Sequence, residues 1–216
     1  QPHSGVQANL AVFFSCLKIG DTILSMDFSA GGHLSHGHPL SIVSKLYKIE
    51  KYNVNEKNEL IDYENLSIIA NKVKPQLIIA GASSYSREID YKKISNIAKN
   101  VRAFLLIDMA HIAGLIASNC LKNPIKYCDF ITSTTHKTLR GTRGGFIICK
   151  KEFEDKINKA IENIENYNKE HSSILNEIKE GIEARNWLRK WIKNWWMMMA
   201  ISAMIIYIMV KEKIVR

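Results

Sequence analysis

Along the first 150 residues, segments with a helical pattern of hydrophobic and polar positions alternate with segments that have the pattern of a strand. Apolar residues recur at helical spacing, or fill long runs bounded by helix start and stop signals, at 6–17, 64–72 and 91–100. Shorter runs with strand character, most of them nearly all apolar, lie at 22–27, 45–54, 77–81, 104–108, 131–135 and 146–149. Apolar strands that alternate with helices are typical of a parallel sheet covered on both faces. We therefore predict an α/β fold with a mostly parallel central sheet.

The residues after the strand at 131–135 are the first candidates for chemistry. Lys137 follows the end of this strand, beside His136 and before a turn rich in arginine and glycine at 140–145. An amine shielded from water and close to other cations has a lowered pKa and can attack a carbonyl group. The pattern therefore fits Schiff-base chemistry, and a surface lysine in a basic turn fits the same residues equally well.

Two further features suggest a site at one edge of the sheet. Asp108 ends another predicted strand, and ligands of such sheets bind at the carboxyl ends of the strands. Ser4 and Gly5 begin the first helix, where free N–H groups can bind a phosphate. A strand-end cap and an ordinary helix N-cap explain the same residues without a ligand.

Three histidines lie in the loop at 31–38, namely His33, His36 and His38. Their spacing raises the question of a metal site, but no carboxylate or cysteine lies near them in the sequence to complete one. We predict no metal, and interpret His36 and His38 as loop residues without a role in the site.

Four motifs carry a family resemblance: Gln1-Pro2-His3-Ser4-Gly5, Gly31-Gly32-His33-Leu34-Ser35-His36-Gly37, Asp108-Met109-Ala110-His111-Ile112-Ala113-Gly114-Leu115 and Thr134-Thr135-His136-Lys137-Thr138-Leu139 with Gly141, Arg143, Gly144 and Gly145 after it. Together, and in this order, they resemble the serine hydroxymethyltransferase family of fold-type I pyridoxal-phosphate enzymes. The resemblance runs from Gln1 to about Ile157. It departs from the family at Val6, where serine is common, and at Thr142, where proline is usual.

The resemblance implies the large domain of a fold-type I pyridoxal-phosphate transferase, without the small C-terminal domain. It implies that Lys137 holds pyridoxal 5'-phosphate covalently, that Asp108 pairs with the pyridinium nitrogen, and that His33 stacks on the ring. His111 would lie near the phenolic oxygen of the cofactor and the substrate. The other implied residues are Ser4 and Gly5 at the phosphate, Ser83 at the cofactor, and His136 beside the lysine. Catalytic roles fall to Lys137, Asp108, His111 and His136.

The reaction implied by the resemblance interconverts serine and glycine, with a one-carbon unit passed to tetrahydrofolate. The resemblance also implies a homodimer or tetramer, in the cytoplasm or in mitochondria. Its acid–base glutamate, its cofactor-facing tyrosine and its carboxylate-binding arginine have no counterpart in residues 1–216, so we expect impaired turnover from this chain. A different fold-type I enzyme, such as an aminotransferase or decarboxylase, fits less well because the motifs occur together. The other alternative is a truncated, non-catalytic homologue that acts in subunit interaction or at a membrane.

Composition and charge restrict the class of protein and its partners. The 46% hydrophobic and 24% charged residues are typical of a globular protein, and the four cysteines show no C-x-x-C spacing, as expected of reduced thiols. The net charge is +9, but residues 185–216 carry +6 of it. No basic run with interleaved aromatic residues occurs elsewhere, which argues against a nucleic-acid partner.

The chain divides by composition into two predicted parts. Residues 1–157 form the cofactor-binding part. Residues 158–216 form a divergent tail, which begins with a predicted helical stretch rich in lysine, asparagine and isoleucine and ends with a part rich in tryptophan and methionine. The uncharged run at 195–210 has 16 residues, fewer than the roughly 20 that a membrane-spanning helix needs. A membrane partner is therefore not favoured.

Overall fold

The computed structural model describes residues 1–167, 169, 179–183, 185–186 and 188–190. It forms two units, Gln1–Ile164 and Glu165–Arg216, and the described residues of the second unit are helical. None of the described helices is both long enough and apolar enough to cross a membrane. The uncharged run at 195–210 lies outside the described residues, and the predicted boundary after residue 157 stays a prediction.

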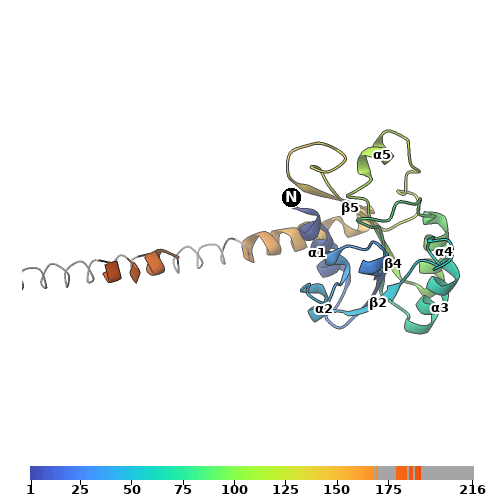
Figure 1. The fold of residues 1–216 in the computed structure, drawn as a ribbon, viewed down its shortest axis with the longest axis horizontal. Coiled ribbons are helices and arrows are strands. Elements are labelled where there is room, and N and C mark those ends of the chain that lie inside the picture. The colour runs from blue at the N-terminus through green and yellow to red at the C-terminus, as the bar shows by residue number, and fades with distance from the viewer. Residues whose placement is uncertain (168, 170–178, 184, 187, 191–216) are drawn as a thin grey trace, which may run out of the picture. The chain divides into compact units, whose positions relative to one another are not determined.

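One six-stranded sheet organises the first unit, in the order β2-β1-β3-β4-β5-β6 (Figure 1). All neighbouring strands are parallel except β5 and β6, which are antiparallel. The prediction of an α/β fold with a mostly parallel sheet is therefore confirmed. The strands are β1 Thr22–Met26, β2 Lys48–Tyr52, β3 Leu77–Ala80, β4 Phe104–Asp108, β5 Phe130–Thr134 and β6 Gly145–Cys149.

Between residues 1 and 153 the structure describes five α-helices and three short 3-10 helices beside the strands, and residues 154–167 form a further helix. The three predicted long helices are confirmed, whereas α2 and α5 were not predicted because four or five residues are too few to show a helical period. The predicted strand at 45–54 was wrong at its start, since α2 occupies its first two residues. The α-helices are α1 Gly5–Cys16, α2 Val43–Leu46, α3 Tyr63–Val73, α4 Tyr91–Val101 and α5 Ala113–Ala117, and the 3-10 helices are η1 Phe28–Ala30, η2 Leu34–His36 and η3 Lys151–Phe153.

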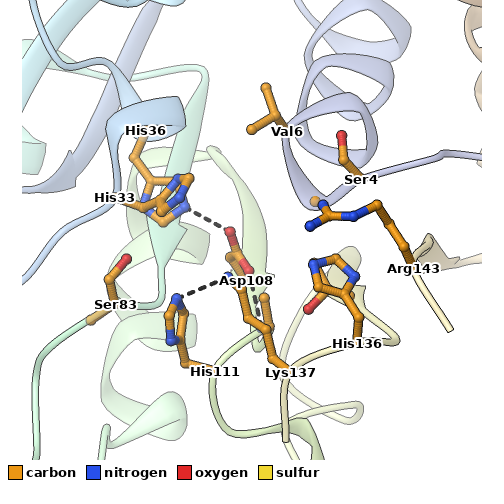
Figure 2. A pocket seen from close by; sticks show the side chains of 14 residues that line it. Ser4, Val6, His33, His36, Ser83, Asp108, His111, His136, Lys137 and Arg143 are labelled. Atoms are coloured by element: carbon orange, nitrogen blue, oxygen red, sulfur yellow. Dashed lines mark hydrogen bonds and ion pairs between the residues drawn. The ribbon is translucent and has the colours of Figure 1, made fainter. Parts of the chain in front are cut away.

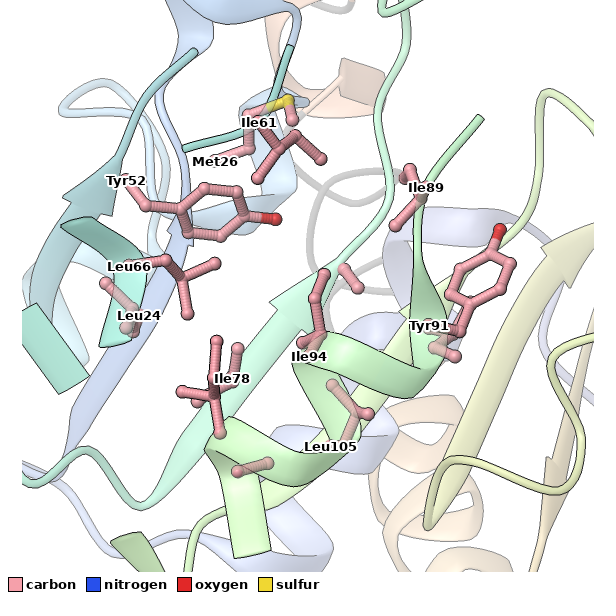
Figure 3. Close-up of a cluster of buried hydrophobic side chains, with 14 of the residues drawn as sticks. Leu24, Met26, Tyr52, Ile61, Leu66, Ile78, Ile89, Tyr91, Ile94 and Leu105 are labelled. Carbon is pink, nitrogen blue, oxygen red and sulfur yellow. The ribbon is translucent and has the colours of Figure 1, made fainter. Parts of the chain in front are cut away.

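The sheet has one hydrophobic core on each face. Each central strand contributes side chains to both cores, because successive side chains of a strand point to opposite faces. Ile78 packs into the core beneath α3 and α4, together with Leu66, Ile94 and Leu105 (Figure 3). Its neighbour Ile79 packs into the other core, whose members include Val12 and Phe13 of α1, Leu106, Phe130 and Ile157. Burial on both faces explains why these strands read as continuous apolar runs.

Candidate active site

A cavity of about 150 Å³ lies where β3, β4 and β5 end and α1 begins. Asp108 is the last residue of β4 and Thr134 the last of β5, so the strands themselves place both side chains at the cavity. Figure 2 shows Asp108 among the side chains that line it. All eight residues predicted for the site line this cavity. Its lining consists of Ser4, Gly5, Val6, His33, His36, Ala82, Ser83, Asp108, Ala110, His111, Thr134, His136, Lys137 and Arg143.

Two glycines let these elements approach each other closely. Gly81 follows β3 with φ of +151°, and a Cβ there would lie 2.2 Å from the carbonyl oxygen of Asp108. A Cβ on Gly5 would lie 2.9 Å from Cγ2 of Thr134. The first glycine admits the end of β4, and the second brings the start of α1 against the end of β5.

The carboxylate of Asp108 accepts three hydrogen bonds. Its Oδ2 accepts from Nε2 of His36 at 2.8 Å and from Nδ2 of Asn9 at 2.9 Å, and its Oδ1 accepts from the backbone N–H of Ala110 at 3.1 Å. Burial by itself would raise the pKa of Asp108, but these donors, His36 above all, hold the pKa well below its usual range. Asp108 therefore stays ionised although its side chain is only 11% exposed.

His36 corrects one interpretation made from the sequence. It was interpreted as a loop histidine without a role, yet it is 1% exposed and contacts Asp108. It lies in η2, one turn away from His33, and both rings line the cavity. Within the part of the chain that the structure describes, no group of three or more His, Cys, Asp or Glu residues is arranged to hold a metal ion.

The amine of Lys137 lies 2.9 Å from Nε2 of His111. Burial lowers the pKa of Lys137, although the charge of Asp108 opposes this shift. Burial also lowers the pKa of His111, and the positive charge of Lys137 adds to the effect. Both shifts favour the neutral forms, so Lys137 loses its proton more readily than a lysine in water, which is what a nucleophilic amine requires.

His33 is held as a neutral ring. Its Nδ1 accepts the backbone N–H of Ser35 at 3.1 Å and lies 2.8 Å from the hydroxyl oxygen of the same residue. Because a backbone N–H can only donate, Nδ1 is unprotonated and the ring carries its proton on Nε2. Burial, with the charge of His36 next in size, lowers the pKa of His33 to about 4. An uncharged aromatic face of this kind is suited to stacking on another ring.

The start of α1 forms the positive side of the cavity. Ser4 is the N-cap of this helix and its Oγ accepts from the backbone N–H of Gln7, so the cap predicted as an alternative is present. The first N–H groups of a helix and its dipole attract an anion, whether or not the cap is made. Figure 2 shows the guanidinium group of Arg143 extended toward Ser4, which adds a full positive charge.

Two hydroxyl groups at the cavity suggest a ligand. Oγ of Ser83 and Oγ1 of Thr134 are buried and have no hydrogen-bond partner among the described residues. An unpaired buried polar group costs about 1–3 kcal/mol, so native proteins rarely keep two of them in one place without a partner.

His136 lines the same cavity, but its nearest polar contact is with the turn that follows it. Its Nδ1 accepts the backbone N–H of Gly144 at 3.4 Å. This contact fixes the ring beside Lys137 and suggests that His136 shapes the site. The predicted catalytic role of His136 stays a prediction.

Besides Thr134, which ends β5, sequence reasoning missed three polar residues of the site. Arg143 lay within a recognised motif, but a turn arginine does not reveal which way it points. Asn9 was a stronger signal, because a polar residue in the middle of an apolar helical run must find partners when it is buried. The third, His36, could not be told from its neighbour His38 by spacing alone.

Comparison with known proteins agrees with the motifs. The sequence model of a family described as serine hydroxymethyltransferase matches residues 1–183. The chain is 57% identical over 162 residues to the serine hydroxymethyltransferase of Methanosarcina barkeri (strain Fusaro / DSM 804), and this match covers 74% of the chain. It covers 39% of that relative, so the chain spans about two fifths of the relative's length. The family match extends beyond Ile157, where the motif resemblance ends.

Proposed function

Because the chain belongs to the serine hydroxymethyltransferase family, we propose that its cavity binds pyridoxal 5'-phosphate and that Lys137 holds this cofactor covalently. One observation carries the proposal. The amine of Lys137, the ionised carboxylate of Asp108 and the N-terminus of α1 converge on one cavity from three separate elements.

The residues present fit each part of this cofactor. The amine of Lys137 suits the aldehyde, the carboxylate of Asp108 suits the pyridine nitrogen, and the neutral ring of His33 suits the aromatic face. The start of α1, together with Arg143, suits the phosphate. The two unpaired hydroxyls, of Ser83 and Thr134, would gain the hydrogen bonds that they lack among the described residues.

Pyridoxal phosphate supplies, when bound, an electron sink for charge that develops at the substrate's α-carbon. Asp108, kept ionised by its three donors, would hold a proton on the ring nitrogen. Nε2 of His111 can accept a hydrogen bond from Lys137, and the lowered pKa of Lys137 leaves more of its amine uncharged and able to attack. His33 would orient the ring, and its low pKa keeps it uncharged at neutral pH.

We extend the proposal to the reaction of the family. A protein of the relative's length that contains this sequence would interconvert serine and glycine and pass the one-carbon unit to tetrahydrofolate, as a homodimer or tetramer in the cytoplasm or in mitochondria. This step is supported by the family match and by identity to the archaeal relative, whose length the chain covers only in part.

Covalent labelling tests the cofactor proposal. The purified chain is mixed with pyridoxal 5'-phosphate, reduced with borohydride, digested and mapped by mass spectrometry. We expect one pyridoxyl group on Lys137, and loss of that label in the variant Lys137→Arg. Lys150, which lies outside the cavity and pairs with Asp129, serves as the internal control. Label on Lys150 in place of Lys137, or no stoichiometric label, would overturn the proposal.

A further inference from the structure

Asn9 is a polar residue in the buried part of α1. It is 1% exposed, and Ala8, Ala11, Val12 and Phe13 of the same helix are fully buried beside it. Burying an amide is unfavourable unless its donors and acceptor find partners. The partners of Asn9 therefore explain why this helix carries a polar side chain in its core.

Three elements supply those partners. Oδ1 of Asn9 accepts from the hydroxyl of Thr132, in β5, at 2.6 Å. Nδ2 donates to Oδ2 of Asp108, at the end of β4, at 2.9 Å, and to Oγ of Ser35, in η2, at 3.0 Å. Both N–H bonds of the amide are used, so the side chain is fixed by β4, β5 and η2 together.

The direction of each hydrogen bond follows from the carboxylate. An ionised carboxylate only accepts, so the NH₂ group of Asn9 must face Asp108 and its oxygen must face Thr132. Ser35 then accepts the second N–H of Asn9, which leaves the hydrogen of its own hydroxyl free to point to Nδ1 of His33 at 2.8 Å. One amide thus connects Asp108 to His33.

We infer that Asn9 is a positioning residue, which sets the carboxylate of Asp108 and, through Ser35, the ring of His33 in one arrangement. The inference rests on the proposed function in so far as these two groups face the cofactor ring. Asn9 itself does not line the cavity, so it acts only through the groups that it holds.

A double-mutant cycle tests this coupling without any cofactor. Denaturant unfolding is measured for Asn9→Leu, Asp108→Asn and the double variant. If Asn9 holds the carboxylate, Asn9→Leu lowers the unfolding midpoint more when Asp108 is present than when residue 108 is asparagine. The matched control is Val12→Ala, a buried change in the same helix, which should be additive with Asp108→Asn. Additivity of Asn9→Leu with Asp108→Asn would overturn the inference.

A spectroscopic test addresses the role toward the ring. Pyridoxal phosphate labelled with ¹⁵N at the ring nitrogen is bound to each protein, and its ¹⁵N chemical shift reports how far this nitrogen is protonated. We expect Asn9→Leu to move the shift from the wild-type value toward that of Asp108→Asn, and Val12→Ala to leave it unchanged. An unchanged shift in Asn9→Leu would show that Asn9 is only structural and would overturn the inference.

The two experiments separate the inference from the proposed function. If the wild-type chain does not take up the cofactor, the proposed function fails, and the unfolding cycle still decides whether Asn9 holds Asp108. If Asn9→Leu does not fold, Thr132→Val replaces it in both tests. This variant removes the hydroxyl that orients Asn9 but leaves the amide in place, and it should show the same coupling to Asp108 in weaker form.

Discussion

At the scale of single residues, the site lowers the pKa of both of its ionisable groups, the carboxyl of Asp108 and the amine of Lys137. Asp108 is surrounded by donors and loses its proton readily, whereas Lys137 faces a histidine and holds its proton less firmly than in water. Burial acts on both groups, and only the carboxylate has enough hydrogen bonds to overcome it. A cavity arranged in this way favours a negative carboxylate and a reactive amine at the same pH.

The neutral ring of His33 predicts a dependence of stability on pH. Its pKa is about 4 in the folded chain against an ordinary 6.5, so the unfolded chain binds more protons between these values. Stability from His33 is therefore complete above pH 6.5 and is lost as the pH falls toward 4. We expect His33→Asn, which can still cap η2, to flatten the fall in unfolding midpoint over this window.

The exposed His3 provides the control, since His3→Asn also removes one histidine. It should leave the slope between pH 6.5 and 4 as in the wild type. An unchanged slope in His33→Asn would show that the ring is not held neutral by the fold.

The residues of the site were predictable where a motif or a strand end marked them. Lys137 and Asp108 follow strands, and the position of a strand end is a consequence of periodicity. Asn9 and His36 were not assigned, because their importance depends on which way a side chain turns in three dimensions. Nothing in the spacing of His33, His36 and His38 says that the second of them points at Asp108.

At the scale of elements, the close approach of β3 and β4 places the carboxylate. Gly81 should therefore be sensitive to substitution. In Gly81→Ala the new Cβ would meet the carbonyl oxygen of Asp108 at 2.2 Å, and the backbone would keep a φ that favours glycine. We expect a loss of about 1–3 kcal/mol in the free energy of unfolding and weaker cofactor binding, measured by urea unfolding and by titration.

Gly20→Ala is the matched control for this experiment. Gly20 has a φ of +90°, but no atom lies within 4 Å of the Cβ that would be added. The variant Gly20→Ala therefore strains the backbone, but its new Cβ does not collide with another atom. Similar losses in stability and cofactor binding in the two variants would contradict the prediction, because they would show that Gly81 is not needed for the close approach of β4.

The strands and the long helices were predictable because each repeats its pattern over several turns or alternations. The antiparallel pairing of β5 and β6 is consistent with the connection at 135–144, which is shorter than the roughly dozen or more residues that a crossover between parallel strands needs. The short helices α2 and α5 were not predictable, since hydrogen bonds to neighbouring segments decide their conformation. Gly114 of α5, for example, donates its backbone N–H to the hydroxyl of Thr138.

At the scale of the whole molecule, the first unit contains every group that we propose to hold the cofactor. Its sheet has helices on both faces, and the cavity lies within Gln1–Ile164. The family resemblance assigns the acid–base glutamate and the carboxylate-binding arginine to segments without a counterpart in residues 1–216. We therefore expect that binding of the cofactor and turnover of serine can be separated in a polypeptide of residues 1–216.

We predict that a polypeptide of residues 1–216 alone binds pyridoxal phosphate but interconverts serine and glycine slowly. Acid–base assistance contributes about 100- to 10,000-fold to a reaction of this kind, and positioning of the substrate contributes more. The measurement is a radiolabelled serine-to-glycine assay with saturating cofactor and tetrahydrofolate, with a full-length family member as the positive control. We expect a rate at least about 100-fold below that control, from a protein that still labels at Lys137. A comparable rate would mean that residues 1–216 already supply the acid–base group and the substrate clamp, and that both lie within reach of the cavity beside Lys137.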